Sequence, residues 1–192
     1  MTLLEEMEQY ALEKDVPIML QEGITFMCSF IKEHQLKSIL EIGSAIGYSA
    51  IRMAMLDKNI HITTIERDEE RYQKAKEYIA RSEYKDQITL LYGDALEADI
   101  QGSYDMIFID AAKAQYIRFF ERYEPLLIQG GYIITDNLKF HGFVEHPETA
   151  TSRNLRQLVG KISRFINYLK SRDDFDTTFL EQGDGIGISK KK

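Results

Sequence analysis

Short apolar runs alternate along the chain with longer stretches in which apolar and charged residues recur at helical spacing. The apolar runs predict strands and the amphipathic stretches predict helices. Strands are expected at 38–42, 61–66, 87–94, 104–110 and 130–137, and helices at 48–56, 68–82, 114–127 and 151–171. Two more strands, 175–182 and 185–192, meet at Gly183-Asp184, which predicts a closing hairpin.

Apolar strands separated by helices are typical of a parallel sheet with helices on both faces. We therefore predict an α/β fold with a mostly parallel seven-stranded sheet and a C-terminal antiparallel hairpin. No internal repeat and no Pro/Gly-rich linker interrupts residues 1–192, so a single domain is expected.

Amino-acid composition indicates the class of protein and its compartment. The 192 residues are 44% hydrophobic, which suits a globular core, and a lone Cys28 cannot form an internal disulfide. The N-terminus is acidic and amphipathic, unlike a signal peptide, and no apolar run approaches the roughly 20 residues of a membrane span. We expect a cytoplasmic protein that does not contact membranes.

Charge is distributed unevenly along the chain. The net charge of −7 disfavours nucleic acid as a partner, but the stretch from Arg153 to Arg172 carries only basic charges. Its basic residues are Arg153, Arg156, Lys161, Arg164, Lys170 and Arg172. The sequence therefore predicts one basic helix on an otherwise acidic protein.

Polar residues follow the predicted strands where ligands gather in parallel sheets, at the carboxyl ends. The first strand enters "EIGSAIGYS", in which Gly43 and Gly47 permit a tight turn into a helix. Glu66 ends the next strand and can accept both hydroxyls of a ribose. The spacing differs from the dinucleotide fingerprint, and the acidic surroundings of Glu41, Glu66 and Asp94 favour the sulfonium of S-adenosylmethionine. Asp94 could equally be a turn former.

A second polar group follows the fourth and fifth strands. Asp110 ends one strand and Asp136-Asn137 ends the other, so three oxygen ligands can meet around a hard cation such as Mg²⁺. Lys113 lies three residues after Asp110, where it can take a proton from a hydroxyl bound to the cation or stabilise the resulting oxyanion. Each residue has a structural alternative: a polar turn for Asp136-Asn137 and a surface lysine for Lys113.

The motifs "EIGSAIGYS", "IERD", "GDA", "FIDAAKAQY", "TDN" and "GDGI" together resemble those of the cation-dependent O-methyltransferases of the caffeoyl-CoA and catechol type. The resemblance runs from about Val16 to the C-terminus. It implies a Rossmann-like core at 36–192 behind N-terminal helices at 1–35, S-adenosylmethionine as cofactor, and a homodimer. Ala112 stands where plant members of the caffeoyl-CoA type have a second aspartate, and the lid over the acceptor is expected to be short.

The same resemblance assigns roles to individual residues. It places the metal on Asp110, Asp136 and Asn137 and the catalytic roles on Lys113 and Asp110. Cofactor contacts fall on Val16, Glu41, Gly43, Ser49, Glu66, Asp94, Ala95 and Asp110.

Two acceptors compete for the predicted methyl transfer. One is a small catechol-like or caffeoyl-type phenol. The other is 5-hydroxyuridine at the tRNA wobble position, whose adjacent oxygens can chelate a metal in the same way, and the chain looks similar to the bacterial tRNA 5-hydroxyuridine methyltransferases. We favour the tRNA, with its anticodon loop bound by the basic helix at Arg153–Arg172, although that helix could simply cover the sheet. A non-catalytic cofactor-binding protein is a third reading, which the presence of both aspartates, Asn137 and Lys113 disfavours.

Overall fold

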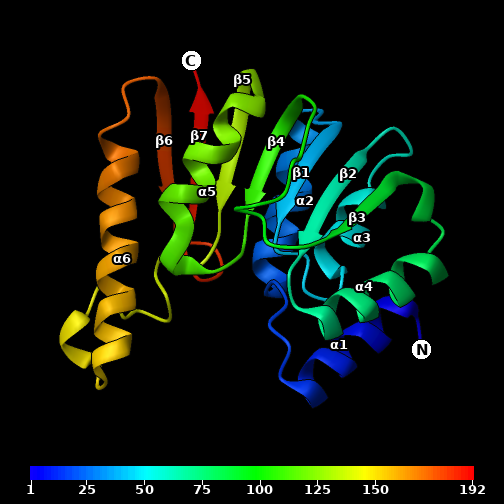
Figure 1. Ribbon diagram of the computed structural model, residues 1–192, viewed down its shortest axis with the longest axis horizontal. Helices are drawn as coiled ribbons and strands as arrows, with labels where there is room; N and C mark the ends of the chain where they lie inside the picture. Colours follow the sequence, from blue (N-terminus) through cyan, green and yellow to red (C-terminus); the bar gives the residue numbers. More distant parts are fainter. The chain divides into compact units, whose positions relative to one another are not determined.

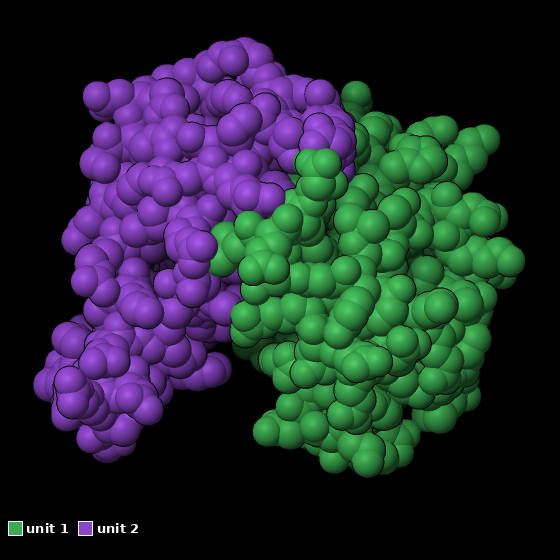
Figure 2. Space-filling view, viewed as in Figure 1, with its two compact units in different colours: residues 1–100 green, residues 101–192 purple.

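The computed structural model describes residues 1–192 as two compact units, residues 1–100 (unit 1) and residues 101–192 (unit 2), coloured separately in Figure 2. The strands form a seven-stranded sheet in the order β3-β2-β1-β4-β5-β7-β6, and Figure 1 labels the strands and helices. Strand β7 runs antiparallel to both of its neighbours, whereas β1, β2 and β3 pair in parallel, as do β4 and β5. The predicted α/β fold with a C-terminal antiparallel hairpin is confirmed.

Unit 1 contains three strands and four α-helices. In chain order these are α1 (Leu3–Lys14), α2 (Gln21–Glu33), β1 (Ser38–Ile42), α3 (Tyr48–Ala54), β2 (His61–Glu66), α4 (Glu69–Arg81), the short 3₁₀ helix η1 (Lys85–Gln87) and β3 (Ile88–Tyr92). Strand β1 is buried at every position after Ser38, as a central strand covered on both faces should be. The register pairs Glu41 of β1 with Thr64 of β2 and Glu66 of β2 with Tyr92 of β3.

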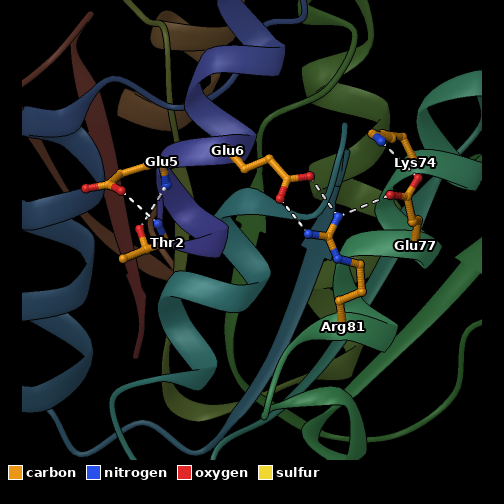
Figure 3. A network of polar contacts seen from close by, with 6 residues as sticks. All are labelled: Thr2, Glu5, Glu6, Lys74, Glu77 and Arg81. Atoms are coloured by element: carbon orange, nitrogen blue, oxygen red, sulfur yellow. Dashed lines mark hydrogen bonds and ion pairs between the residues drawn. The ribbon is translucent and has the colours of Figure 1, made fainter.

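A polar network fastens α1 to α4 (Figure 3). Thr2 and Glu5 form a capping box that satisfies free N–H groups at the start of α1. Arg81 of α4 donates to both carboxylate oxygens of Glu6 and also to Glu77, at 2.5–3.2 Å. These contacts hold α1 against α4 within unit 1.

Unit 2 contains four strands and two α-helices. These are β4 (Tyr104–Ile109), η2 (Lys113–Gln115), α5 (Tyr116–Tyr123), η3 (Glu124–Leu126), β5 (Leu127–Thr135), η4 (Pro147–Thr149), α6 (Arg153–Lys170), β6 (Phe175–Leu180) and β7 (Ile186–Lys191). Helix α6 buries Val159, Ile162, Phe165 and Leu169 on one face. Phe120 of α5 packs edge to face against both Phe165 and Phe175, which anchors α6 and β6 to α5.

Two predicted boundaries in unit 2 are wrong. The helix predicted over 114–127 is broken into η2, α5 and η3, and Pro125 explains its end because proline cannot donate the helical hydrogen bond. Strand β5 begins at Leu127 rather than at residue 130, and the glycines lie inside it. Gly130 has a φ of 75° and the pairing with β4 shifts register there. A Cβ on Gly131 would lie 2.9 Å from the Asp105 carbonyl oxygen, so this glycine pair forms a bulge instead of starting the strand.

No helix in residues 1–192 combines the length and the apolar character that crossing a bilayer requires.

Candidate cofactor and acceptor sites

The turn after β1 in unit 1 depends on its two glycines. Gly43 and Gly47 have φ values of 98° and 84°, in the region that side chains disfavour. A Cβ on Gly47 would also press against Ile79 at 3.3 Å. The N–H groups of Gly43 and Ser44 donate to the Ile65 carbonyl of β2, which fixes the turn against the neighbouring strand.

Glu41 and Ser49, both predicted to contact the cofactor, contact each other. The Glu41 side chain is fully buried at the end of β1 and accepts hydrogen bonds from the Ser49 hydroxyl and, at 2.5 Å, from the Thr64 hydroxyl. Thr64 was not among the predicted residues, although its parallel register opposite Glu41 could have indicated it. The carboxylate therefore links β1, β2 and the start of α3 behind the glycine turn.

Glu66 is oriented at the end of β2 by backbone groups. One carboxylate oxygen accepts from the Ala45 N–H at 2.9 Å, and the other accepts from the N–H groups of Arg67 and Asp68, both at 2.9 Å. The glycine turn and Glu66 thus lie together, as predicted. A carboxylate held in this way has one fixed orientation.

Asp94 forms a turn of its own. Its Oδ1 accepts from the Leu96 N–H at 2.8 Å, and its carbonyl receives the N–H groups of Glu97 and Ala98. Gly93 donates to the Glu66 carbonyl, which brings this turn beside Glu66, and Ala95 is buried next to it. Val16 lies between α1 and α2, where its N–H donates to the Ala11 carbonyl.

In unit 2 the structure brings together the three residues predicted as metal ligands. Asn137 donates from Nδ2 to Asp110 Oδ1 at 3.2 Å and from its backbone N–H to Asp136 Oδ1 at 2.7 Å. Asn137 has a φ of 64°, a left-handed conformation that asparagine tolerates better than most residues. The Asn137 amide nitrogen faces Asp110, so the side chains of Asp110, Asp136 and Asn137 meet at the ends of β4 and β5.

The environment of Asp110 and Asp136 raises the pKa values of both carboxyl groups. Burial raises the pKa of Asp110, and burial together with the charge of Asp110 raises the pKa of Asp136 to about 7. The positive charge of Lys113 opposes both shifts. The Lys113 ammonium lies 5.7 Å from the centre of the Phe140 ring. The two carboxylates share one neighbouring cation, Lys113, while burial and mutual repulsion oppose their ionisation together.

Two further residues support this region and were not predicted. Tyr116 donates its hydroxyl to the Asp136 carbonyl at 3.0 Å, and burial raises its pKa well above the usual value. Asp184, from the "GDGI" motif, accepts the backbone N–H of His141 at 2.6 Å. Asp184 Oδ2 is buried without a hydrogen-bond partner, and His141 Nδ1 lies 3.7 Å from it. These contacts fix the chain that follows β5 to Tyr116 of α5 and to Asp184.

Residues 1–192 contain no group of three or more acidic, histidine or cysteine side chains arranged to hold a metal ion. The convergent set of unit 2 contains two carboxylates and an amide. Hard divalent cations accept amide oxygens as well as carboxylates and complete their shell with water, so the set is chemically suited to such an ion.

The sheet order, the glycine turn after β1 and the carboxylate that ends β2 define a class I S-adenosylmethionine-dependent methyltransferase. A family model described as O-methyltransferase matches residues 1–192. The chain belongs to this family of S-adenosylmethionine-dependent O-methyltransferases.

Known proteins resemble the whole chain. A Staphylococcus aureus crystal structure, whose assignment as a caffeoyl-CoA O-methyltransferase is itself provisional, is 40% identical with a TM-score of 0.95 and covers 100% of this chain and 93% of that one. An O-methyltransferase from Bacillus cereus in complex with SAH is 27% identical with a TM-score of 0.85, covering 99% and 90%. The caffeoyl-CoA O-methyltransferase of Stellaria longipes is 28% identical over 177 residues, or 88% of this chain and 72% of the relative.

Proposed function

We propose that this protein is a Mg²⁺-dependent O-methyltransferase that converts 5-hydroxyuridine at the tRNA wobble position to 5-methoxyuridine. The observation that carries the metal-dependent step is the convergence of Asp110, Asp136 and Asn137 beside Lys113. The observation that favours RNA over a small acceptor is the basic face of α6 in the same unit.

Asp110, Asp136 and Asn137 would hold the cation. Burial and mutual repulsion oppose ionisation of both carboxylates, and a divalent ion would stabilise the pair as anions. When bound, such an ion lowers the pKa of a hydroxyl that it ligates. The chain's contribution is to present three oxygens from the ends of two adjacent strands, β4 and β5.

The cofactor would be S-adenosylmethionine, held by the eight residues that the family resemblance assigns. Glu66 is the best supported of these, because three backbone N–H groups fix its carboxylate for the ribose hydroxyls. Glu41 and Ser49 would act partly through each other, since their hydrogen bond fixes the start of α3. Val16, Gly43, Asp94, Ala95 and Asp110 complete the proposed set.

The proposed methyl transfer is a single displacement at the methyl carbon. The acceptor oxygen forms a bond to the methyl carbon while the carbon–sulfur bond breaks. The electron pair of the broken carbon–sulfur bond stays on sulfur, which changes from a sulfonium into a neutral thioether. Lys113 either takes the hydroxyl proton or stabilises the oxyanion by its charge. Its position next to Asp110 and Asp136 suits both roles.

The second candidate acceptor is a caffeoyl-type phenol. It is favoured by the names of relatives, among them the caffeoyl-CoA O-methyltransferase of Stellaria longipes. Both acceptors carry the adjacent oxygens that a cation can chelate, so the acidic pair does not discriminate between them.

Mass spectrometry of tRNA nucleosides from cells that lack the protein tests the acceptor. Loss of 5-methoxyuridine with accumulation of 5-hydroxyuridine is expected, and restoring the gene should reverse it. An unchanged nucleoside profile would reject the tRNA proposal in favour of the phenol.

Binding to the anticodon loop has its own test. Reversing Arg153, Arg156 and Arg164 to Glu should weaken tRNA binding by roughly tenfold or more, because each contact with a phosphate contributes to affinity. The salt dependence of binding should decrease with it. Cofactor binding should be unaffected. The homodimer that the family suggests is checked by light scattering of the same preparations.

A further inference from the structure

A cavity of about 230 Å³ lies in unit 2 between α6 and the segment formed by η2 and the start of α5. It is smaller than the roughly 300–1,000 Å³ of sites for drug-sized ligands, so it suits one compact group. Four of its lining side chains are cationic, namely Lys113, Arg118, Lys161 and Arg164. No acidic side chain lines it. The charges around the cavity therefore favour an anion over a cation.

The inner wall of the cavity is rigid. Phe165 of α6 and Tyr116 of α5 are almost fully buried and pack edge to face at 5.3 Å. Tyr116 is tied to the Asp136 carbonyl by its hydroxyl. On the other side, Arg118 donates to Gln115 Oε1 at 3.1 Å, which orients its guanidinium. The shape is fixed by core packing on one side and by a side-chain hydrogen bond on the other.

The outer cations of this cavity have no counter-ion. Arg118, Lys161 and Arg164 take part in none of the ion pairs of residues 1–192. Arg172, just beyond the end of α6, shows the contrast because it pairs with both Glu124 and Asp174. Lys161 and Arg164 are three residues apart on one helix face, where like charges repel. A bound anion would relieve this repulsion.

We propose that this cavity binds a phosphate group of the acceptor, next to the hydroxyl that is methylated. The inference rests on the proposed function and deepens it. Lys113 connects the two places, because it lines the cavity and its charge also acts on Asp110 and Asp136. A phosphate here could be the phosphodiester beside a splayed-out nucleotide or a phosphate of a coenzyme A ester.

Direct titration tests the cavity without any methyl transfer. Uridine 3′,5′-bisphosphate and coenzyme A are titrated separately into the full-length protein by calorimetry, with uridine as the phosphate-free reference. The double variant Lys161→Glu/Arg164→Glu should weaken binding of the true ligand by roughly tenfold or more. Lys76→Glu, at an exposed position of α4 that does not line the cavity, is the control for the change of charge. Circular dichroism verifies that the variants are folded.

The two probes distinguish the sources. Tighter binding of the bisphosphate supports an RNA phosphodiester, whereas tighter binding of coenzyme A supports a thioester acceptor and counts against the tRNA proposal. If neither probe binds, or if the double variant and Lys76→Glu bind equally, the phosphate cavity is rejected.

Methylation assays separate this inference from the proposed function. With an anticodon stem-loop containing 5-hydroxyuridine, Lys161→Glu/Arg164→Glu should raise KM several-fold while kcat stays unchanged. With the free nucleoside, which has no phosphate, wild type and variant should be equal. Wild-type protein that binds the bisphosphate but methylates neither substrate would retain the cavity and overturn the tRNA proposal. A variant that loses kcat with both substrates would overturn the cavity's role as a phosphate site.

Discussion

Buried carboxylates meet opposite conditions in the two units. In unit 1, both oxygens of Glu41 and both oxygens of Glu66 accept hydrogen bonds, from two hydroxyls and from three backbone N–H groups respectively. In unit 2, burial raises the pKa of Asp110 and Asp136, and Asp184 leaves one oxygen without a hydrogen bond. The two buried carboxylates of unit 1 are satisfied by hydrogen bonds, whereas in unit 2 the acidic pair is hard to ionise and the cations Arg118, Lys161 and Arg164 have no ion-pair partner.

This contrast has a physical meaning. A fully hydrogen-bonded carboxylate keeps one orientation and maintains a preformed surface. A carboxylate pair without enough donors is costly in the folded protein until a cation arrives. Residues in unit 1 should therefore contribute mostly to stability and cofactor affinity, and the acidic residues of unit 2 should contribute to activity at the expense of stability.

The largest effect is expected from the acidic pair. Asp110→Ala or Asp136→Asn should lower kcat/KM by roughly a thousandfold or more, since metal activation accounts for several kcal/mol of transition-state stabilisation. Excess EDTA should do the same to the wild type. Full activity in chelator would contradict the metal role.

The substitution Asp136→Asn also tests the comparison of the two units through thermal stability. Without metal, Asp136→Asn should unfold at the same temperature as the wild type or higher, because it removes a repelling charge next to Asp110. Added Mg²⁺ should raise the melting temperature of the wild type but not of the variant. Asp173→Asn, on the exposed surface of unit 2, is the matched control. Strong destabilisation by Asp136→Asn would show that the pair is structural.

Glu66→Gln is expected to have the next largest effect, on cofactor affinity. The amide cannot accept on both sides, so it loses hydrogen bonds from backbone donors and faces the ribose with one donor group. S-adenosylmethionine should bind roughly ten- to a hundredfold more weakly by calorimetry. Glu70→Gln, an exposed residue in the first turn of α4, should bind normally. Equal affinities would remove Glu66 from the cofactor site.

Thr64→Val tests whether unit 1 uses its polar groups for stability. Removing the hydroxyl leaves the fully buried Glu41 with one fewer donor, which should lower the free energy of unfolding by about 1.5–3 kcal/mol in urea titrations. The same substitution at Thr63, one residue earlier and only partly buried, is the control. If the two variants are equally stable, the Glu41–Thr64 hydrogen bond does not stabilise unit 1.

Much of the fold and of the candidate site could be predicted from the sequence, because local patterns mark the ends of strands. The glycine turn, Glu66, and the convergence of Asp110 with Asp136-Asn137 follow from strand order alone, since parallel strands end at one edge. Thr64 and Asp184 were missed because their partners, Glu41 and His141, are 23 and 43 residues away and depend on register and loop path. The early start of β5 was missed because Gly130-Gly131 is typical of a turn, and a bulge is defined only by pairing with β4.

The smallest effect is expected at the start of α1 in unit 1, where Thr2 caps the helix (Figure 3). Thr2→Ala removes a hydrogen bond to the Glu5 N–H and should cost about 0.5–1 kcal/mol, mostly as fraying of the first turn. Hydrogen exchange should therefore speed up at the amides of Glu5 and Glu6 without changing exchange in α4. Thr2→Ser, which retains the cap, should restore protection. Faster exchange throughout α4 would instead mean that the N-terminal helix stabilises all of unit 1, because the Glu6–Arg81 contact would then be lost together with the cap.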